Sequence, residues 1–367
     1  MSLRVLVVDD TVVFRRIVSD ALAGLPGVEV VGTASNGKLA LAKMEALRPD
    51  LVTLDIEMPE MNGIEVLEGM GRAELKAGVI VLSSVTTRGG EMTVRALELG
   101  AFDFITKPDR GTPAENLASL RELLRPMVRA FERRRDIRAM LGRNGAAAPP
   151  VEVLAPPPAP QGQEPPVLRR AFAGTPMVLI GVSTGGPAAL AVVLPALPKD
   201  LNAPVLVVQH MPAMFTRPLA ASLARKSALR VTEAQDGEIA LPNCAYVAPG
   251  GSHMKVAAGS RGEVVLQITG DPPENGCRPA VDYLFRSVAL QFPGRSVAAI
   301  LTGMGNDGTA GLRMLKRGRC RSIAQDEASC VVFGMPKEAI AAGVIDTVAP
   351  LDRIAATIVR SVREGFA

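Results

Sequence analysis

"MVLIGVSTGG", residues 177 to 186, is the stretch that decides how the second half of this chain folds. Its apolar run predicts a buried β-strand, and the glycines that follow predict a tight turn into a helix. Residues 181 to 185 read G-x-S-x-G, which is typical of a strand-to-helix turn that exposes a serine. A dinucleotide-binding fingerprint would need glycine in place of Ser183, and a P-loop would need a lysine after its last glycine. The pattern therefore favours an exposed Ser183 over a phosphate cradle.

Apolar runs alternate with helical periodicity along the whole second half of the chain. This alternation predicts a doubly wound, mostly parallel α/β domain over residues 173–367. The expected strands are 177–182, 203–209, 243–249, 263–269, 296–303 and 321–326, and the expected helices are 187–197, 279–291, 308–318 and 336–343.

Three residues that could form a catalytic triad each follow a predicted strand of this domain. They are Ser183, His210 and Asp307. Because the carboxyl ends of parallel strands meet at one edge of a sheet, we expect the three side chains to lie close together. A serine needs a base, and the imidazole needs a carboxylate to orient it. The order Ser, His, Asp differs from that of the α/β-hydrolases, so the motif does not indicate that fold.

Each of these residues also has a structural interpretation. Ser183 could cap a helix, and the glycines near Asp307 could simply permit tight turns. Those glycines could instead let the backbone approach an oxyanion, with the N–H groups of Met304 or Thr184 as donors. The chain's other histidine, His253, lies in the predicted loop "PGGSHM" and is the second candidate for the base, or a residue at the rim of the site.

The first 108 residues predict a separate parallel sheet built from five βα units. The expected strands are 3–8, 28–34, 51–56, 78–84 and 102–108. Asp9, Asp10 and Asp55 stand at the ends of two of them, where three carboxylates would repel one another without a cation. Oxygen ligands of this kind suit Mg²⁺. Each Asp could also be an ordinary turn residue.

A hydroxyl and an ammonium stand at the ends of two further predicted strands of this sheet, at Ser83 and Lys107. Both could bind a phosphoryl group carried by Asp55, the hydroxyl by hydrogen bonding and the ammonium by its charge. Lys107 could equally be a surface charge. The whole set, at strand ends and in this order, favours a phosphorylation site.

Residues 145–166 separate the two domains. They hold 8 of the chain's 29 prolines, which predicts a stiff, extended linker. A helical pattern precedes the linker, with a kink or break expected at Pro126. The predicted division is 1–122 for the first domain, 123–172 for the helix and linker, and 173–367 for the second domain.

Composition narrows the possible functions and the compartment. The chain has 48% apolar and 21% charged residues, which is typical of a soluble globular protein, and with 3% aromatic residues and no Trp it is poorly equipped to stack nucleic-acid bases. The arginines between residues 121 and 143 indicate a solvated helix face rather than a DNA-binding helix. Four cysteines without a C-x-x-C pair argue against a zinc site, and the chain has no membrane-spanning stretch, so we expect a reducing cytoplasm.

The first domain resembles the receiver domain of bacterial response regulators. The resemblance rests on D-D at 9–10, D-x-x-M-P at 55–59 and K-P at 107–108. It implies a flavodoxin-like fold, phosphorylation of Asp55 and Mg²⁺ held by the three aspartates. It also implies switch roles for Ser83 and Lys107, and Phe104 stands where the family often has a switch tyrosine. Without a hydroxyl, Phe104 could contribute only packing.

The second domain resembles the catalytic domain of the chemotaxis protein-glutamate methylesterases, the CheB family. The matching motifs are "GVSTGG", "VVQHM", "RPAVDYLF", "LTGMGNDG" and "DEASCVVFGMP". The resemblance implies hydrolysis of glutamate γ-methyl esters on chemoreceptors and deamidation of receptor glutamines, with Ser183 as nucleophile, His210 as base and then acid, and Asp307 as the orienting carboxylate. The Met304 backbone would help form the oxyanion hole.

The family resemblance also implies regulation and partners. The unphosphorylated receiver would inhibit the esterase, a chemotaxis histidine kinase would donate phosphate and chemoreceptors would be the substrate, with no nucleic acid bound and no membrane insertion. Two alternatives stay open: a response regulator whose output is binding, and an esterase in a chemosensory array that controls something other than swimming. The strand-end Ser, His and Asp argue against a purely binding output.

Overall fold

The computed structural model describes residues 2–84, 86–108, 111–143, 176–294 and 296–364. The chain divides into two compact units, Met1–Ala147 and Ala148–Ala367, which are described separately below. The linker predicted at 145–166 lies outside the described residues. None of the helices in the described ranges is long and apolar enough to cross a membrane.

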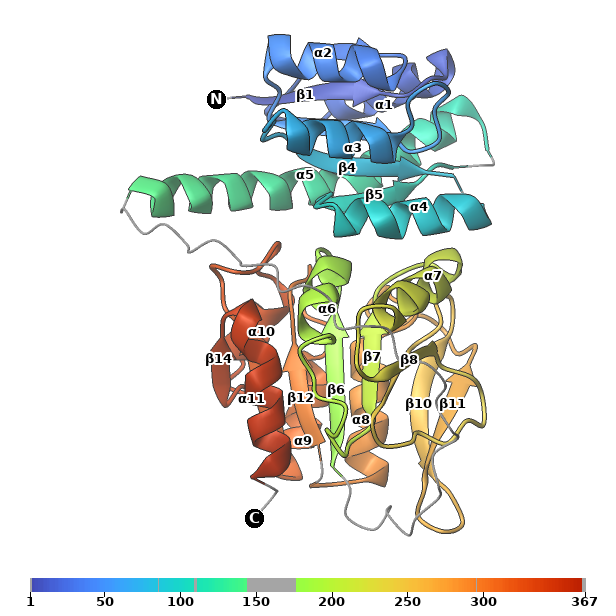
Figure 1. The fold of residues 1–367 in the computed structure, drawn as a ribbon, viewed down its shortest axis with the longest axis vertical. Helices are drawn as coiled ribbons and strands as arrows, with labels where there is room; N and C mark the ends of the chain where they lie inside the picture. Colours follow the sequence, from blue (N-terminus) through green and yellow to red (C-terminus); the bar gives the residue numbers. More distant parts are fainter. Residues whose placement is uncertain (1, 85, 109–110, 144–175, 295, 365–367) are drawn as a thin grey trace. The chain divides into compact units, whose positions relative to one another are not determined.

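The first unit contains a parallel sheet in the order β2-β1-β3-β4-β5, which is the flavodoxin-like order. Helices α1 and α5 pack together, and α2, α3 and α4 form a second layer (Figure 1). Its elements are β1 (Leu3–Val8), α1 (Val12–Ala23), β2 (Val28–Ala34), α2 (Gly37–Leu47), β3 (Leu51–Asp55), α3 (Gly63–Arg72), β4 (Gly78–Ser83), α4 (Thr87–Glu98), β5 (Asp103–Thr106) and α5 (Pro113–Arg143).

Helix α5 continues through Pro126, where a kink or break was expected, and ends at Arg143. Leu124 and Val128, on either side of the proline, are 0% and 2% exposed, so packing holds the helix together although Pro126 cannot donate a backbone hydrogen bond. Phe131 packs edge-on against Phe102 next to β5, with ring centroids 5.5 Å apart. The first unit therefore extends beyond the boundary expected at residue 122.

The second unit contains a parallel sheet in the order β14-β13-β12-β6-β7-β9-β8 and a separate antiparallel pair, β10 and β11. Helix α6 contacts α7 and α11, and α9 contacts α8 and α10. The first elements are β6 (Met177–Val182), α6 (Gly186–Val193), β7 (Val205–Gln209), α7 (Ala213–Ala224), β8 (Arg230–Glu233), β9 (Cys244–Val247), β10 (His253–Ala258) and β11 (Val264–Thr269). The remaining elements are α8 (Val281–Gln291), β12 (Ser296–Ile300), α9 (Thr309–Arg317), β13 (Arg321–Gln325), α10 (Met335–Ala341), β14 (Thr347–Ala349) and α11 (Leu351–Arg363). The predicted α/β fold class is confirmed.

Strand order places a crevice in each sheet. The connections run in opposite directions on the two sides of β1 and β3 in the first unit, and of β6 and β12 in the second. Ligands bind at the carboxyl ends of the strands at such switch points. Asp9 and Asp55 stand at the first switch point, and Ser183 and the loop with Asp307 stand at the second.

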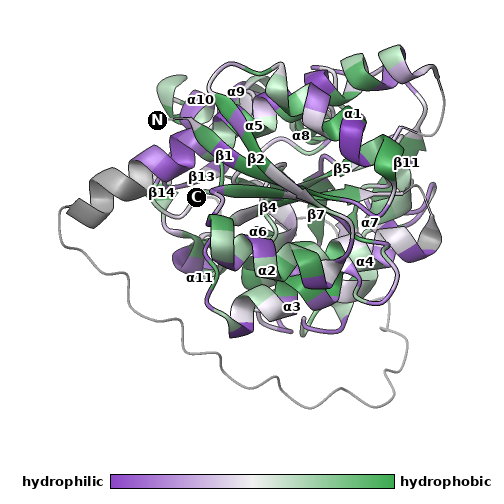
Figure 2. Ribbon diagram, turned by 90° about the horizontal axis from the view of Figure 1, so that it is seen from above, coloured by the Kyte–Doolittle hydropathy of each residue, from purple (hydrophilic) through white to green (hydrophobic). Residues whose placement is uncertain are grey.

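Hydrophobic strands form the buried centre of both units. All residues of β6 and β7 are buried, and the strand β4 is mainly green in Figure 2, whereas helices such as α3 and α5 carry both hydrophilic and hydrophobic residues. Phe285 of α8 is among the largest fully buried side chains. It anchors this helix, whose first residues bind Asp307 as described below.

Replacing Phe285 with alanine removes that anchor. We expect Phe285→Ala to lower the free energy of unfolding by about 3–5 kcal/mol, because the substitution leaves a cavity in a packed core. Leu290, on the same helix and 65% exposed, provides the matched control, since Leu290→Ala should change stability little. Urea unfolding followed by circular dichroism measures both. Equal losses for the two variants would contradict this account of the core.

Candidate functional site

Ser183 is held at the end of β6 by backbone contacts. Its N–H donates to the carbonyl of Thr302 at 3.0 Å. The N-cap of α6 is Gly185, in the left-handed region at φ 76°, so Ser183 is not the capping residue of this helix. A Cβ on Gly303 would lie 2.8 Å from the Ser183 Cβ, so glycine is required there for this close approach. The turn leaves Ser183 partly exposed.

The backbone of His210 is fixed beside that of Ser183. The His210 N–H donates to the carbonyl of Val182 at 3.1 Å. The buried Gln209 amide donates to the carbonyls of Ser183 and His210, at 3.0 and 3.1 Å. A Cβ on Gly186 would lie 1.9 Å from the Gln209 Oε1, so the glycine makes room for this amide. Gln209 therefore ties the predicted nucleophile to the predicted base.

Asp307 binds the ring of His210. Its Oδ2 lies 2.7 Å from the His210 Nε2, and the two side chains are only 3% and 12% exposed. An ionised carboxylate can only accept hydrogen bonds, so Nε2 carries the proton and Nδ1 is the nitrogen that can act as a base. Among the described residues no hydrogen bond joins the Ser183 hydroxyl to His210. The structure thus brings two of the three predicted residues into direct contact, and the contact of Ser183 with Nδ1 stays a prediction.

The ionised forms of His210 and Asp307 stabilise each other, and this effect outweighs the cost of burying the two charges. Burial opposes the charge on His210, but the bonds to Asp307 and Cys277 outweigh it and raise the pKa of the imidazole to about 9. Burial likewise opposes ionisation of Asp307, yet His210 and the backbone N–H groups lower the pKa of this carboxyl below its ordinary value. The contact therefore favours the imidazolium over the neutral imidazole and the carboxylate over its protonated form.

Cys277 contacts the imidazole at a different nitrogen from Asp307. Its Sγ is 3.6 Å from the His210 Nδ1, whereas Asp307 binds Nε2. His210, Cys277 and Asp307 are close enough together to suggest a metal site. The Asp307 carboxylate accepts hydrogen bonds from His210 and from two backbone N–H groups, so the described contacts favour an orienting carboxylate over a metal ligand.

His253 does not lie in the predicted loop. It is the first residue of β10 and is 0% exposed. Its Nε2 lies 3.0 Å from the carbonyl of Pro272, its Nδ1 accepts from the N–H of Ala280, and its ring stacks on Tyr283. The interpretation of His253 as a rim residue was wrong, because packing between β10 and α8 encloses the ring.

The two predicted oxyanion donors flank Ser183 in different ways. Thr184 follows it directly, is 7% exposed, and accepts at its carbonyl from the Thr302 hydroxyl at 2.9 Å. Met304 follows Gly303, whose carbonyl accepts from the N–H groups of Gly334 and Met335. Within the described ranges, no protein acceptor takes the N–H of Thr184 or of Met304. Both donors stay available to an oxyanion.

In the first unit, Asp9, Asp10 and Asp55 form a second cluster, with one oxygen of each within 4.8 Å of the others. The Lys107 ammonium lies 2.7 Å from Asp9 and 2.7 Å from Asp55. Burial raises the pKa of Asp55 to about 6, against the opposing effect of Lys107. Asp9 and Asp55 are buried and Asp10 is exposed, and such a group of carboxylate oxygens fits Mg²⁺, which prefers these ligands.

The predicted switch residues are buried near this cluster. The Ser83 hydroxyl accepts from the Thr93 hydroxyl of α4 at 2.7 Å and donates to the carbonyl of Ser84, so it is engaged away from Asp55. Phe104 is 9% exposed within β5. The hydroxyls of Ser84 and Thr86 bind the carboxylate of Glu57. The sequence patterns did not single out these three residues.

Comparison with known proteins agrees with both halves of this description. Residues 178–358 match the CheB methylesterase family, and residues 5–116 match the response regulator receiver domain. Curated relatives called protein-glutamate methylesterase/protein-glutamine glutaminase are 51% identical in Desulfotalea psychrophila and 46% identical in Bacillus subtilis, each covering 99% of both chains. The chain belongs to the CheB methylesterase family.

A solved structure of a CheB catalytic domain supports the same assignment. The catalytic domain of the Thermotoga maritima CheB methylesterase is 42% identical, covers 51% of this chain and 99% of its own, and has a TM-score of 0.50. Strand-end positions and then the family resemblance indicated Ser183, His210 and Asp307, but neither indicated Gln209 or Cys277. Only the contacts of their side chains reveal these two, because neither residue type at a strand end or in a turn indicates catalysis by itself.

Proposed function

We propose that this chain hydrolyses glutamate γ-methyl esters of chemoreceptors, releases methanol and deamidates selected receptor glutamines, under control of its receiver domain. The observation that carries the proposal is the 2.7 Å bond between His210 and Asp307 at the switch point where β6 delivers Ser183. The curated relatives' names describe methylesterase and glutaminase activities.

The proposed chemistry gives each of these three side chains one role. The Ser183 hydroxyl attacks the ester carbonyl while the His210 Nδ1 takes its proton, and the N–H groups of Thr184 and Met304 stabilise the oxyanion. The imidazolium then protonates the leaving methoxide, and methanol departs. A water molecule, deprotonated by His210, hydrolyses the acyl-enzyme and restores Ser183. A glutamine side chain follows the same steps with ammonia as the leaving group.

The first unit supplies the control. Asp55 would carry the phosphoryl group, donated by a chemotaxis histidine kinase, with Asp9, Asp10 and Asp55 holding Mg²⁺. The Mg²⁺ ion would neutralise charge on the phosphoryl oxygens, and Lys107 would bind one of them. Ser83 would turn from Thr93 toward the phosphoryl group, and Phe104 would adjust by packing. We place these steps in the cytoplasm, whose reducing conditions suit the chain's four unpaired cysteines.

Regulation requires two arrangements of the domains. In the proposed inactive arrangement the receiver blocks the esterase, and phosphorylation favours the open one through its different interaction with the two states.

Methanol release from receptor membranes that carry radiolabelled methyl esters tests the proposed function. Release should require Ser183, and a small phosphodonor with Mg²⁺ should stimulate it in the wild type but not in Asp55→Asn. Ser183→Ala should lower the rate by about 10⁴-fold or more while the protein stays folded. Absence of release by the wild type, with Asp55 still phosphorylated, would favour a binding output instead.

The pH dependence of the same reaction tests the role of Asp307. His210 acts as a base only when neutral, so kcat/KM should rise with pH up to the imidazole pKa of about 9. Asp307→Asn removes the charge that stabilises the imidazolium, so the acid limb should move to lower pH and kcat should fall by about 10⁴-fold. A wild-type limb at the ordinary histidine pKa would contradict the proposed pairing.

Removal of residues 1–145 tests the inhibitory role of the receiver. The remaining unit has its own sheet and core, so it should fold and release methanol faster than the unphosphorylated full-length chain. Phosphodonor should have no effect on it. A folded fragment with unchanged or lower activity would refute inhibition by the receiver.

A further inference from the structure

Helices α8 and α9 cap each other through two carboxylates. The N–H groups of Val281 and Asp282, at the start of α8, donate to Asp307 at 2.7 and 2.9 Å. In return Asp282 accepts from the N–H of Gly311, in the first turn of α9, at 2.6 Å. The N-cap residues Ala280 and Gly308 supply no side-chain cap of their own. The catalytic carboxylate is thus half of a reciprocal cap.

Asn275 joins the two halves of this cap. Its Nδ2 donates to the Asp282 Oδ2 at 3.0 Å and to the Asp307 Oδ1 at 3.1 Å. Two buried carboxylates close together repel each other, and a shared N–H₂ donor between them offsets this repulsion. Burial raises the pKa of Asp282 to about 6, with Asp307 adding to the effect. The Asn275 amide therefore lies between the two carboxylates and stabilises the negative charge on both.

The turn that presents Asn275 is tightly constrained. Asn275 and Gly276 have φ values of 52° and 74°, and Glu274 and Cys277 exchange two backbone hydrogen bonds around them. An Asn-Gly pair with two positive φ values is typical of a type I′ turn. The Glu274 carboxylate binds the Arg286 guanidinium of α8 through two hydrogen bonds, at 2.6 and 2.7 Å. Both oxygens are engaged, which fixes the turn on α8, the helix that Asp307 caps.

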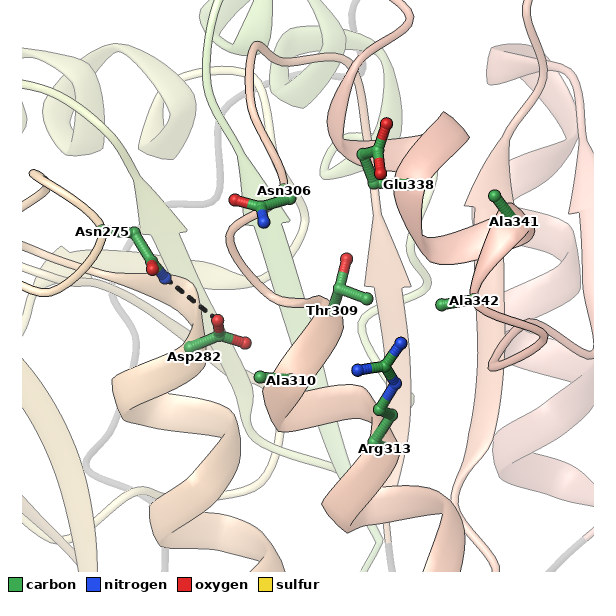
Figure 3. A pocket seen from close by; sticks show the side chains of 9 residues that line it. All are labelled: Asn275, Asp282, Asn306, Thr309, Ala310, Arg313, Glu338, Ala341 and Ala342. Carbon is green, nitrogen blue, oxygen red and sulfur yellow. Dashed lines mark hydrogen bonds between the residues drawn. The ribbon is translucent and has the colours of Figure 1, made fainter.

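The same turn contributes to the surroundings of both ring nitrogens of His210. Asn275 contacts Asp307, which binds Nε2, and Cys277 two residues later contacts Nδ1 at 3.6 Å. A shift of the turn would therefore disturb both ring nitrogens together. Asn275 and Asp282 also line a cavity of about 360 Å³ between α9 and α10, where water can replace a missing side chain (Figure 3).

We propose that Asn275 is a positioning residue of the esterase: its amide joins the reciprocal cap of α8 and α9 and fixes the Asp307 carboxylate on His210. This inference rests on the proposed function. The amide of Asn275 bonds to the two carboxylates and not to the imidazole, so it acts on His210 through Asp307. Removing its donor leaves Asp307 with three backbone donors, from Val281, Asp282 and Gly308, so the helices stay capped. The Asp307 Oδ1 loses one of its three donors, and the carboxylate is held less firmly.

Two substitutions distinguish the effect of the Asn275 amide from the effect of the backbone conformation of the turn. Asn275→Gly keeps the left-handed conformation and removes the amide. Asn275→Asp keeps the shape and replaces the donor by a third carboxylate, which donates only when protonated. The ionisable groups around the position are Glu274 and Cys277 of the same turn, Asp282, Asp307 and His210, with Arg313 and Glu338 across the cavity.

Methanol release by phosphorylated full-length protein, measured from pH 5.5 to 9, tests the inference. Asn275→Gly should lower kcat/KM about 10-fold, since small misplacements of catalytic groups cost at least this much. Asn275→Asp should be more defective at pH 8, and its rate relative to the wild type should recover as the pH falls, because the introduced carboxyl group donates again once it is protonated. Glu338→Gln, in the same cavity but outside the cap, should behave as the wild type.

The experiment distinguishes failure of the positioning role from failure of the proposed function. Absence of release by the wild type would refute the function itself. Normal wild-type release with unchanged kcat/KM in both Asn275 variants would refute the positioning role. A defect in Asn275→Asp with a constant ratio to wild type at every pH would also refute it, because such a defect indicates a structural loss alone. Thermal unfolding midpoints establish that each variant is folded.

Discussion

The bond between His210 and Asp307 depends on the capping of helix α8, whose first N–H groups bind the Asp307 carboxylate. The first N–H groups of a helix have no partner within it, and α8 takes the carboxylate of Asp307 as acceptor. The dipole of α8 also stabilises the negative charge there. The carboxylate is thereby kept ionised although it is 3% exposed, and an ionised Asp307 in turn favours imidazolium at His210. The position of α8 therefore determines both the packing of this region and the charge on the His210–Asp307 pair.

The two units use the same topological principle for different chemistry. In the first, the switch point between β1 and β3 gathers carboxylates with one lysine, a set suited to a cation and a phosphoryl group. In the second, the switch point between β6 and β12 gathers a serine, an imidazole and a carboxylate. The parallel sheet supplies only the position, and the residue types at the strand ends decide the reaction.

Much of this arrangement could be predicted from sequence because strand ends are local features. Ser183, His210 and Asp307 each follow an apolar run, and parallel order alone places them at one edge. The environment of His253 could not be predicted in this way, since its neighbours Pro272 and Tyr283 come from later segments. Helix α5 continues through Pro126 because of tertiary packing, and helix propensities of single residues take no account of such packing. The Asn-Gly pair at 275–276 was a readable turn signal, but its contact with Asp307 depends on the mutual placement of α8 and α9.

The tautomer and pKa of His210 test the central claim most directly, and they can be measured by ¹⁵N nuclear magnetic resonance. The chain has only two histidines, so a His253→Gln variant assigns the signals. The account predicts an imidazole that stays protonated well above pH 6.5, with a pKa of about 9, and whose neutral form carries its proton on Nε2. A pKa at the ordinary histidine value, or a neutral form protonated on Nδ1, would show that Asp307 does not hold the ring as described.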